Sequence, residues 1–161
     1  MAKEEEIVLG ISPGTRTIGI AVYKEGEFVE WKIKAFNEKW SLEKLEKIKE
    51  YIIGIIKAHQ ISCIALKTPH SGRTSPDLEK VVQTIEKIAY KQGIEHCGYA
   101  LEDIKQLCQG KVRTNKYHLA EFISKKHPEL NYEFERHQEK PSAYYLRIFE
   151  AVSCILFHLS I

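Results

Sequence analysis

The first candidate site residue is Ser12, a hydroxyl that directly follows an apolar run over residues 7–11. The run is typical of a buried strand, and Ser12-Pro13-Gly14 ends it, because proline lacks a backbone donor and glycine accepts turn dihedrals. A second apolar run, 18–23, follows at once. The carboxyl end of a buried strand is a usual place for chemistry in α/β sheets, so this hydroxyl is well placed to act on a ligand.

Five basic side chains are candidates for contacts with phosphate: Arg16, Arg73, Lys111, Arg113 and Lys116. For Arg16, in the turn after Ser12, an ordinary solvated turn residue is the favoured interpretation. Arg73 lies in loop 70–75 before an expected helix start, a natural anion site, although an ordinary loop explains it equally well. The other three flank Tyr117 in a stretch that could follow a phosphate backbone, yet such a run alone is usually a solvated face.

The composition predicts one globular domain over residues 1–161. Of these residues 43% are hydrophobic and 29% are charged, which is enough for a real core. A net charge of +2 and a pI near 8.3 permit a nucleic-acid partner without arguing for one. The acidic N-terminal stretch is not a signal peptide, and no apolar run is long enough to span a membrane. We expect a cytoplasmic protein.

Cysteine and histidine spacing gives no sign of a metal site. The four cysteines form no Cys-x-x-Cys pair: Cys63, Cys97, Cys108 and Cys154. Three of them have apolar neighbours, which favours buried free thiols in a reducing compartment. The seven histidines contain no His-x-x-x-His pair, and His158 is interpreted as a packed residue. We expect no metal and no other cofactor.

The elements that must position these residues begin with three strands, at 7–11, 17–23 and 28–34. The last two are joined by a hairpin loop that contains Gly26. Two further apolar runs, 61–66 and about 96–99, predict buried parallel strands.

Helices fill the rest of the chain. A serine, threonine or proline marks each of four expected starts, at Ser41, Ser75-Pro76, Thr114 and Pro141. Gly93 ends the second of these helices, a short further helix is expected at 101–108, and the last helix is apolar on nearly every face. The order predicts an α/β domain, a mixed five-stranded sheet with helices on both faces.

This order and four sequence blocks resemble the RuvC-type Holliday junction resolvases of the ribonuclease H-like superfamily. The block Gly10-Ile11-Ser12-Pro13-Gly14 is similar to the family's Gly-Ile-Asp-Pro-Gly. Ala65-Leu66-Lys67 stands in register with Ala-Ile-Glu, and residues 147–153 with Asp-Ala-Ala-Asp-Ala-Leu-Ala. Segment 110–116 is similar to a Gly-rich, basic, DNA-contacting segment. The resemblance covers essentially the whole chain and implies a ribonuclease H-like fold.

In that family four carboxylates hold two magnesium ions, and these ions activate the water that cleaves DNA. The positions that match them here are Ser12, Lys67, Arg147 and Glu150, of which only Glu150 is acidic. Two cations beside one carboxylate repel a divalent metal, since a charge pair about 4 Å apart near a surface is worth on the order of 4 kcal/mol. We therefore expect Lys67 and Arg147 to pair with Glu150, close the site and exclude magnesium.

The favoured hypothesis is a non-catalytic RuvC-like domain, a pseudoenzyme of DNA recombination that binds branched or duplex DNA rather than RNA. It would act alone or as a homodimer. Its positive surface would be formed by Lys67, Arg73, Lys111, Arg113 and Arg147. A second hypothesis is an active magnesium-dependent endonuclease with a rebuilt site, in which Glu102, Asp103 or Glu139 joins Glu150. A third is a protein-interaction scaffold that binds no nucleic acid.

Overall fold

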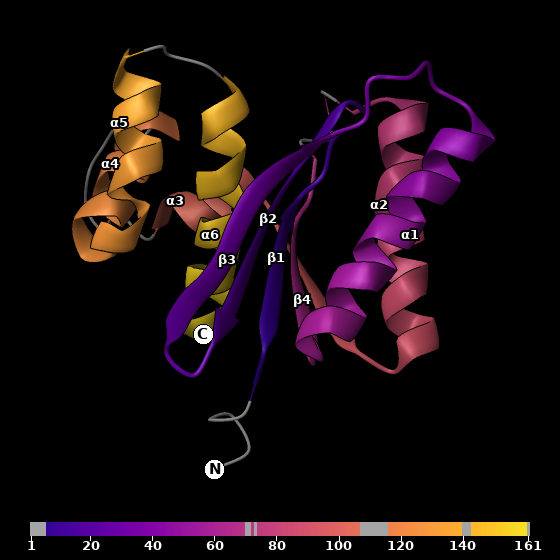
Figure 1. The fold of residues 1–161 in the computed structure, drawn as a ribbon, viewed down its shortest axis with the longest axis horizontal. Helices are drawn as coiled ribbons and strands as arrows, with labels where there is room; N and C mark the ends of the chain where they lie inside the picture. The colour runs from indigo at the N-terminus through magenta and orange to yellow at the C-terminus, as the bar shows by residue number, and fades with distance from the viewer. Residues whose placement is uncertain (1–5, 70–71, 73, 107–115, 140–142, 161) are drawn as a thin grey trace.

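The central element is a mixed five-stranded sheet, as the sequence predicts (Figure 1). The computed structural model describes residues 6–69, 72, 74–106, 116–139 and 143–160. The strands are β1 (Val8–Ser12), β2 (Thr17–Lys24), β3 (Glu27–Ala35), β4 (Cys63–Lys67) and β5 (Glu95–Tyr99). Their order across the sheet is β3-β2-β1-β4-β5. The pairs β1–β2 and β2–β3 are antiparallel, and β1–β4 and β4–β5 are parallel.

Two capped helices cover one face of the sheet. Helix α1 (Leu42–His59) begins after Ser41, whose hydroxyl accepts a hydrogen bond from the Lys44 backbone N–H at 3.0 Å. Helix α2 (Pro76–Gln92) begins after Ser75 and ends at Gly93, which has a φ of 67°. Both predicted starts are confirmed. Strand β4 starts two residues later than predicted, because the Ile61 N–H still bonds to the end of α1.

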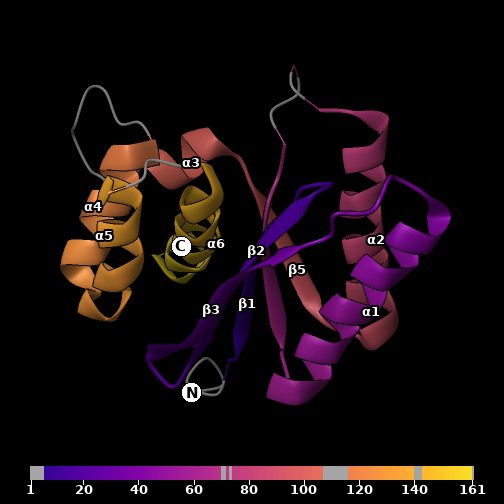
Figure 2. The same cartoon turned by 45° about the horizontal axis from the view of Figure 1, so that its top comes forward.

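A single long helix, α6 (Ala143–Ser160), lies against the other face (Figure 2). Outside it pack α3 (Leu101–Lys105), α4 (Lys116–Lys126), the 3₁₀ turn η3 (Pro128–Leu130) and α5 (Asn131–Glu139). Helix α5 is not predicted by the sequence pattern. The expected caps at residues 114 and 141 fall outside the described residues. Within the described part of the chain, no helix has the length and apolar character needed to cross a bilayer.

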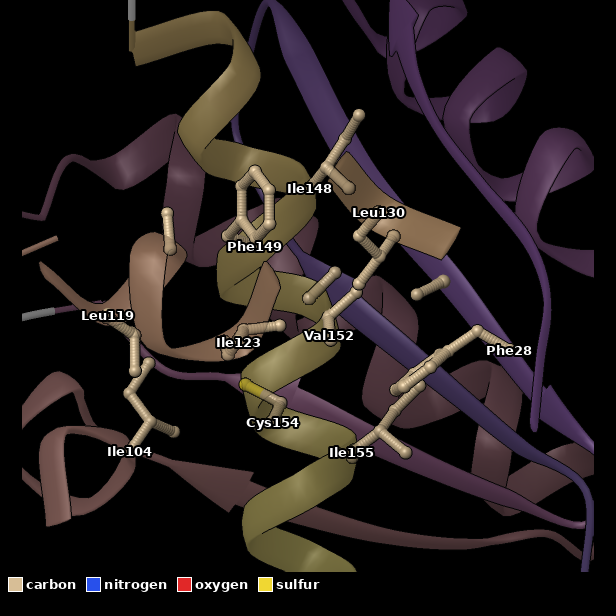
Figure 3. Packing of buried hydrophobic residues seen from close by; sticks show 14 of the residues in the cluster. Phe28, Ile104, Leu119, Ile123, Leu130, Ile148, Phe149, Val152, Cys154 and Ile155 are labelled. Carbon is tan, nitrogen blue, oxygen red and sulfur yellow. The ribbon is translucent and has the colours of Figure 1, made fainter. Parts of the chain in front are cut away.

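The sheet separates two apolar cores. Successive side chains of a strand point to opposite faces, so Val8 packs toward α6 while Leu9 and Ile11 pack toward α1 and α2. Figure 3 shows the α6 side, where Phe149, Val152 and other residues of α6 meet side chains from β3, α3 and α4. Helix α6, which contributes apolar side chains to this core, also carries the candidate site residue Glu150.

Two glycines allow α6 to approach the sheet closely. A Cβ on Gly10 would collide with the Ala151 carbonyl oxygen, and one on Gly19 would collide with the Arg147 carbonyl oxygen. Only glycine fits such an approach of two backbones. Because Gly19 pairs with Ser12 across β1 and β2, this contact sets the first turns of α6 over the end of β1.

Candidate functional site

Three candidate residues meet at one end of the sheet. Strands β1 and β4 are parallel and pair Ile11 with Leu66, so the next residues, Ser12 and Lys67, emerge side by side. Glu150 of α6 lies between them. The Ser12 hydroxyl donates to Glu150 Oε1 at 3.2 Å, and Lys67 Nζ lies 2.6 Å from Glu150 Oε2. Both oxygens of this carboxylate are thereby engaged.

Burial makes this contact important for the fold. Glu150 is only 3% exposed, and Ser12 is fully buried. A carboxylate removed from water in this way must be paired and hydrogen-bonded, or it destabilises the folded state by several kcal/mol. One turn further along α6, burial and the Glu150 charge raise the pKa of the Cys154 thiol, which therefore stays protonated at neutral pH.

Arg147 contacts the turn after β1. Its Nη1 atom donates to the Pro13 carbonyl oxygen at 3.1 Å, and its guanidinium lies against Gly14. The prediction that both cations pair with Glu150 is thus confirmed for Lys67 and wrong for Arg147. Arg147 lies one turn earlier on α6, over the turn between β1 and β2, where a backbone carbonyl accepts its N–H group.

Solved structures share this arrangement of strands and helices. RuvC from Thermus thermophilus superposes with a TM-score of 0.72 at 13% identity, over 96% of this chain and 95% of that one. The yeast mitochondrial Holliday junction resolvase superposes with a TM-score of 0.64 at 10% identity, over 96% of this chain and 81% of that one. The Fowlpox virus resolvase, in a complex with Holliday junction DNA, superposes with a TM-score of 0.58 at 11% identity, over 96% of this chain and 99% of that one. No protein-family profile matches the sequence, and no curated protein does.

The chain has the fold of the RuvC-type resolvases. The TM-scores of 0.58–0.72 establish the ribonuclease H-like fold, and the identities of only 10–13% leave the chemistry to be decided by the residues present.

The residues that the sequence resemblance matches to the family's carboxylates do not fit magnesium. Mg²⁺ requires oxygen ligands in near-octahedral geometry and is bound through carboxylates. Here the Lys67 ammonium lies against the one carboxylate, Ser12 supplies a neutral hydroxyl, and Arg147 supplies a second cation. We derive no metal-dependent step from this set.

Of the three carboxylates in the rebuilt-nuclease hypothesis, one caps a helix and two are exposed. Asp103 Oδ2 accepts from the Ala100 backbone N–H at 2.9 Å and so caps α3. Glu102 is exposed on α3, and Glu139 is exposed at the end of α5. Within the described residues, no group of three potential metal ligands includes Glu150.

The described part of the chain places only some of the predicted phosphate contacts. Arg16 is exposed in the turn between β1 and β2, at the same end of the sheet as Ser12. Lys116 is the first residue of α4. Arg73, Lys111 and Arg113 fall outside the described residues.

Sequence reasoning missed a second polar cluster, formed by Glu6, Cys63 and His158. Cys63 and His158 are 95 positions apart, and Glu6 and His158 are 152 apart. Metal-ligand patterns in a sequence rely on short spacings, so ligands spread over the whole chain leave no such signal. Only the fold brings them together.

Proposed function

We propose that this domain binds branched or duplex DNA and does not cleave it. The observation that carries the proposal is the Lys67–Glu150 ion pair, formed by two residues that the sequence resemblance matches to the family's catalytic carboxylates. With one carboxylate and two cations, Lys67 and Arg147, the site is formally positive where the family's site is strongly negative. A positive site favours a phosphate and disfavours a divalent cation.

The same side chains supply a path for phosphate contact. The Lys67 side chain remains 18% exposed while its ammonium pairs with Glu150. Arg16 is exposed in the turn between β1 and β2, at the same end of the sheet, and Arg147 lies against that turn. Lysine and arginine side chains that neutralise phosphates supply most non-specific affinity for DNA.

The fold supports DNA as the partner. RuvC from Thermus thermophilus and the Fowlpox virus resolvase have both been solved in complex with Holliday junction DNA. This chain superposes on each over 96% of its length. Its net charge of only +2 predicts moderate affinity, and each lysine or arginine that neutralises a phosphate should add to the salt dependence.

The test is binding to a fluorescent four-way junction, measured by anisotropy at several salt concentrations. We expect the logarithm of the affinity to fall linearly with the logarithm of the salt concentration. Arg16→Ala should weaken binding and reduce that slope by about 1, as for the loss of one phosphate contact. Lys24→Ala is the matched control, because Lys24 is exposed at the opposite end of β2 and should leave both quantities unchanged.

Two outcomes would contradict the proposal. Absence of junction and duplex binding at low salt would leave the protein-interaction scaffold as the better hypothesis. An equal loss of affinity in Arg16→Ala and Lys24→Ala would show that DNA does not contact the Ser12 end of the sheet.

A further inference from the structure

The Glu6, Cys63 and His158 cluster lies at the C-terminal end of α6, about two turns beyond Glu150. Glu6 lies two residues before β1, Cys63 is the first residue of β4, and His158 lies in the last turn of α6. One carboxylate oxygen, the thiol sulfur and one imidazole nitrogen lie within 4.8 Å of one another. His158 lies eight positions after Glu150 on α6, about 12 Å along the helix axis, so this cluster is separate from the Ser12–Lys67–Glu150 site.

The distances match those between the ligands of a tetrahedral zinc ion. His158 Nε2 lies 3.5 Å from Cys63 Sγ and 3.1 Å from Glu6 Oε1. With Zn–N and Zn–O bonds of about 2.0 Å and a Zn–S bond of about 2.3 Å, tetrahedral angles separate N from S by about 3.5 Å and N from O by about 3.3 Å. Both distances from His158 Nε2 are therefore within a few tenths of an ångström of those around a shared ion, and the Cys63 and Glu6 ligand atoms lie within 4.8 Å of each other.

The second ring nitrogen of His158 is already held. Its Nδ1 atom lies 2.8 Å from the Tyr99 hydroxyl, and the Tyr99 ring packs edge-on against Phe157 at 5.1 Å. In the tautomer that binds metal through Nε2, Nδ1 carries the hydrogen and donates it to the Tyr99 oxygen. Zinc-binding histidines regularly have such a partner, which fixes the orientation of the ring.

The three ligand side chains are mostly buried, but two of them are partly exposed, so a metal ion can reach them from solvent. Cys63 is fully buried, whereas the side chains of Glu6 and His158 are 19% and 16% exposed. One sulfur, one nitrogen and one oxygen ligand form a set that zinc accepts readily, while magnesium and calcium prefer oxygen alone.

We propose that Glu6, Cys63 and His158 bind one Zn²⁺ ion, with water as the fourth ligand. On binding, the Cys63 thiol releases its proton to solvent and coordinates as the thiolate. The ion would join the segment before β1 to the end of α6, residues that are 152 positions apart in the chain. Such a link stabilises the folded state, because zinc binds this preformed set of ligands and not the unfolded chain.

The test uses the full chain after removal of metal with a chelator. Titration with Zn²⁺ against a chromogenic chelator should show one equivalent bound with micromolar or tighter affinity. Co²⁺ should give a thiolate-to-cobalt charge-transfer band in the near ultraviolet. His158→Gln, Cys63→Ser and Glu6→Gln should each weaken zinc binding at least tenfold, and Tyr99→Phe should weaken it about 10–100-fold.

Cys154→Ala is the matched control, since Cys154 is a buried free thiol on the same helix outside the cluster. It should keep one equivalent of zinc and the cobalt band. The proposal is overturned if the wild type binds less than one equivalent at micromolar zinc, or if His158→Gln binds zinc as tightly as the wild type. Should a variant fail to fold, a wild-type cobalt spectrum without the thiolate band overturns it independently.

Discussion

Replacing Lys67 with alanine should lower the free energy of unfolding by about 3 kcal/mol. The change removes the ammonium that lies 2.6 Å from Glu150 Oε2 and leaves a carboxylate that is only 3% exposed. Removing one partner of a buried ion pair typically costs about 3–5 kcal/mol, and the 18% exposure of the Lys67 side chain places the expected loss at the lower end. Urea unfolding followed by circular dichroism measures the difference.

Two further variants identify the cause of that loss. Lys24→Ala removes an exposed lysine at the end of β2 and should change stability by less than about 0.5 kcal/mol. Lys67→Ala combined with Glu150→Gln should be more stable than Lys67→Ala alone, because the glutamine carries no charge and still accepts from Ser12. A Lys67→Ala protein as stable as Lys24→Ala would show that the ion pair does not hold the site together.

Replacing Lys67 with glutamate should make the stability of the protein depend on magnesium. The variant places a second carboxylate beside Glu150, so in the presence of a chelator we expect a loss of stability at least as large as for Lys67→Ala. Mg²⁺ or Mn²⁺ would bridge the two carboxylates. At a metal concentration 100 times the dissociation constant, this binding would raise the free energy of unfolding by about 2.7 kcal/mol. The measurement is thermal unfolding with chelator and with metal.

The neutral variant Lys67→Gln is the control for that experiment. It also removes the ammonium but supplies no second carboxylate, so magnesium should not stabilise it. Magnesium should not stabilise the wild type either, because the Lys67 ammonium already pairs with Glu150. Equal stabilisation of the wild type and Lys67→Glu by magnesium would contradict this interpretation of the site.

Most of the fold follows from local patterns in the sequence. Short apolar runs predict the strands, and Ser41 and Ser75 mark helix starts that the structure confirms. Helix α5 escapes prediction because its side chains are mostly polar, with Phe134 buried. Its position depends on packing against α4 and α6, which no local pattern records.

The site is less predictable than the fold. Parallel strands with adjacent ends bring Ser12 beside Lys67, and the resemblance identifies Glu150 as the residue opposite them. The contact of Arg147 with the Pro13 carbonyl depends on how closely α6 approaches Gly14 and Gly19. That approach is a property of the packed structure, as is the meeting of Glu6 and Cys63 with His158.

The most direct test of the central claim is a cleavage assay on a labelled four-way junction. The protein is added at concentrations that saturate binding, with Mg²⁺ or Mn²⁺, and the strands are separated on a denaturing gel. We predict that the bound junction stays intact, because the Lys67 ammonium pairs with Glu150, the carboxylate that would have to bind a metal ion. Metal-dependent nicks that appear with the wild type and are absent with an identically purified Glu150→Gln protein would contradict this account.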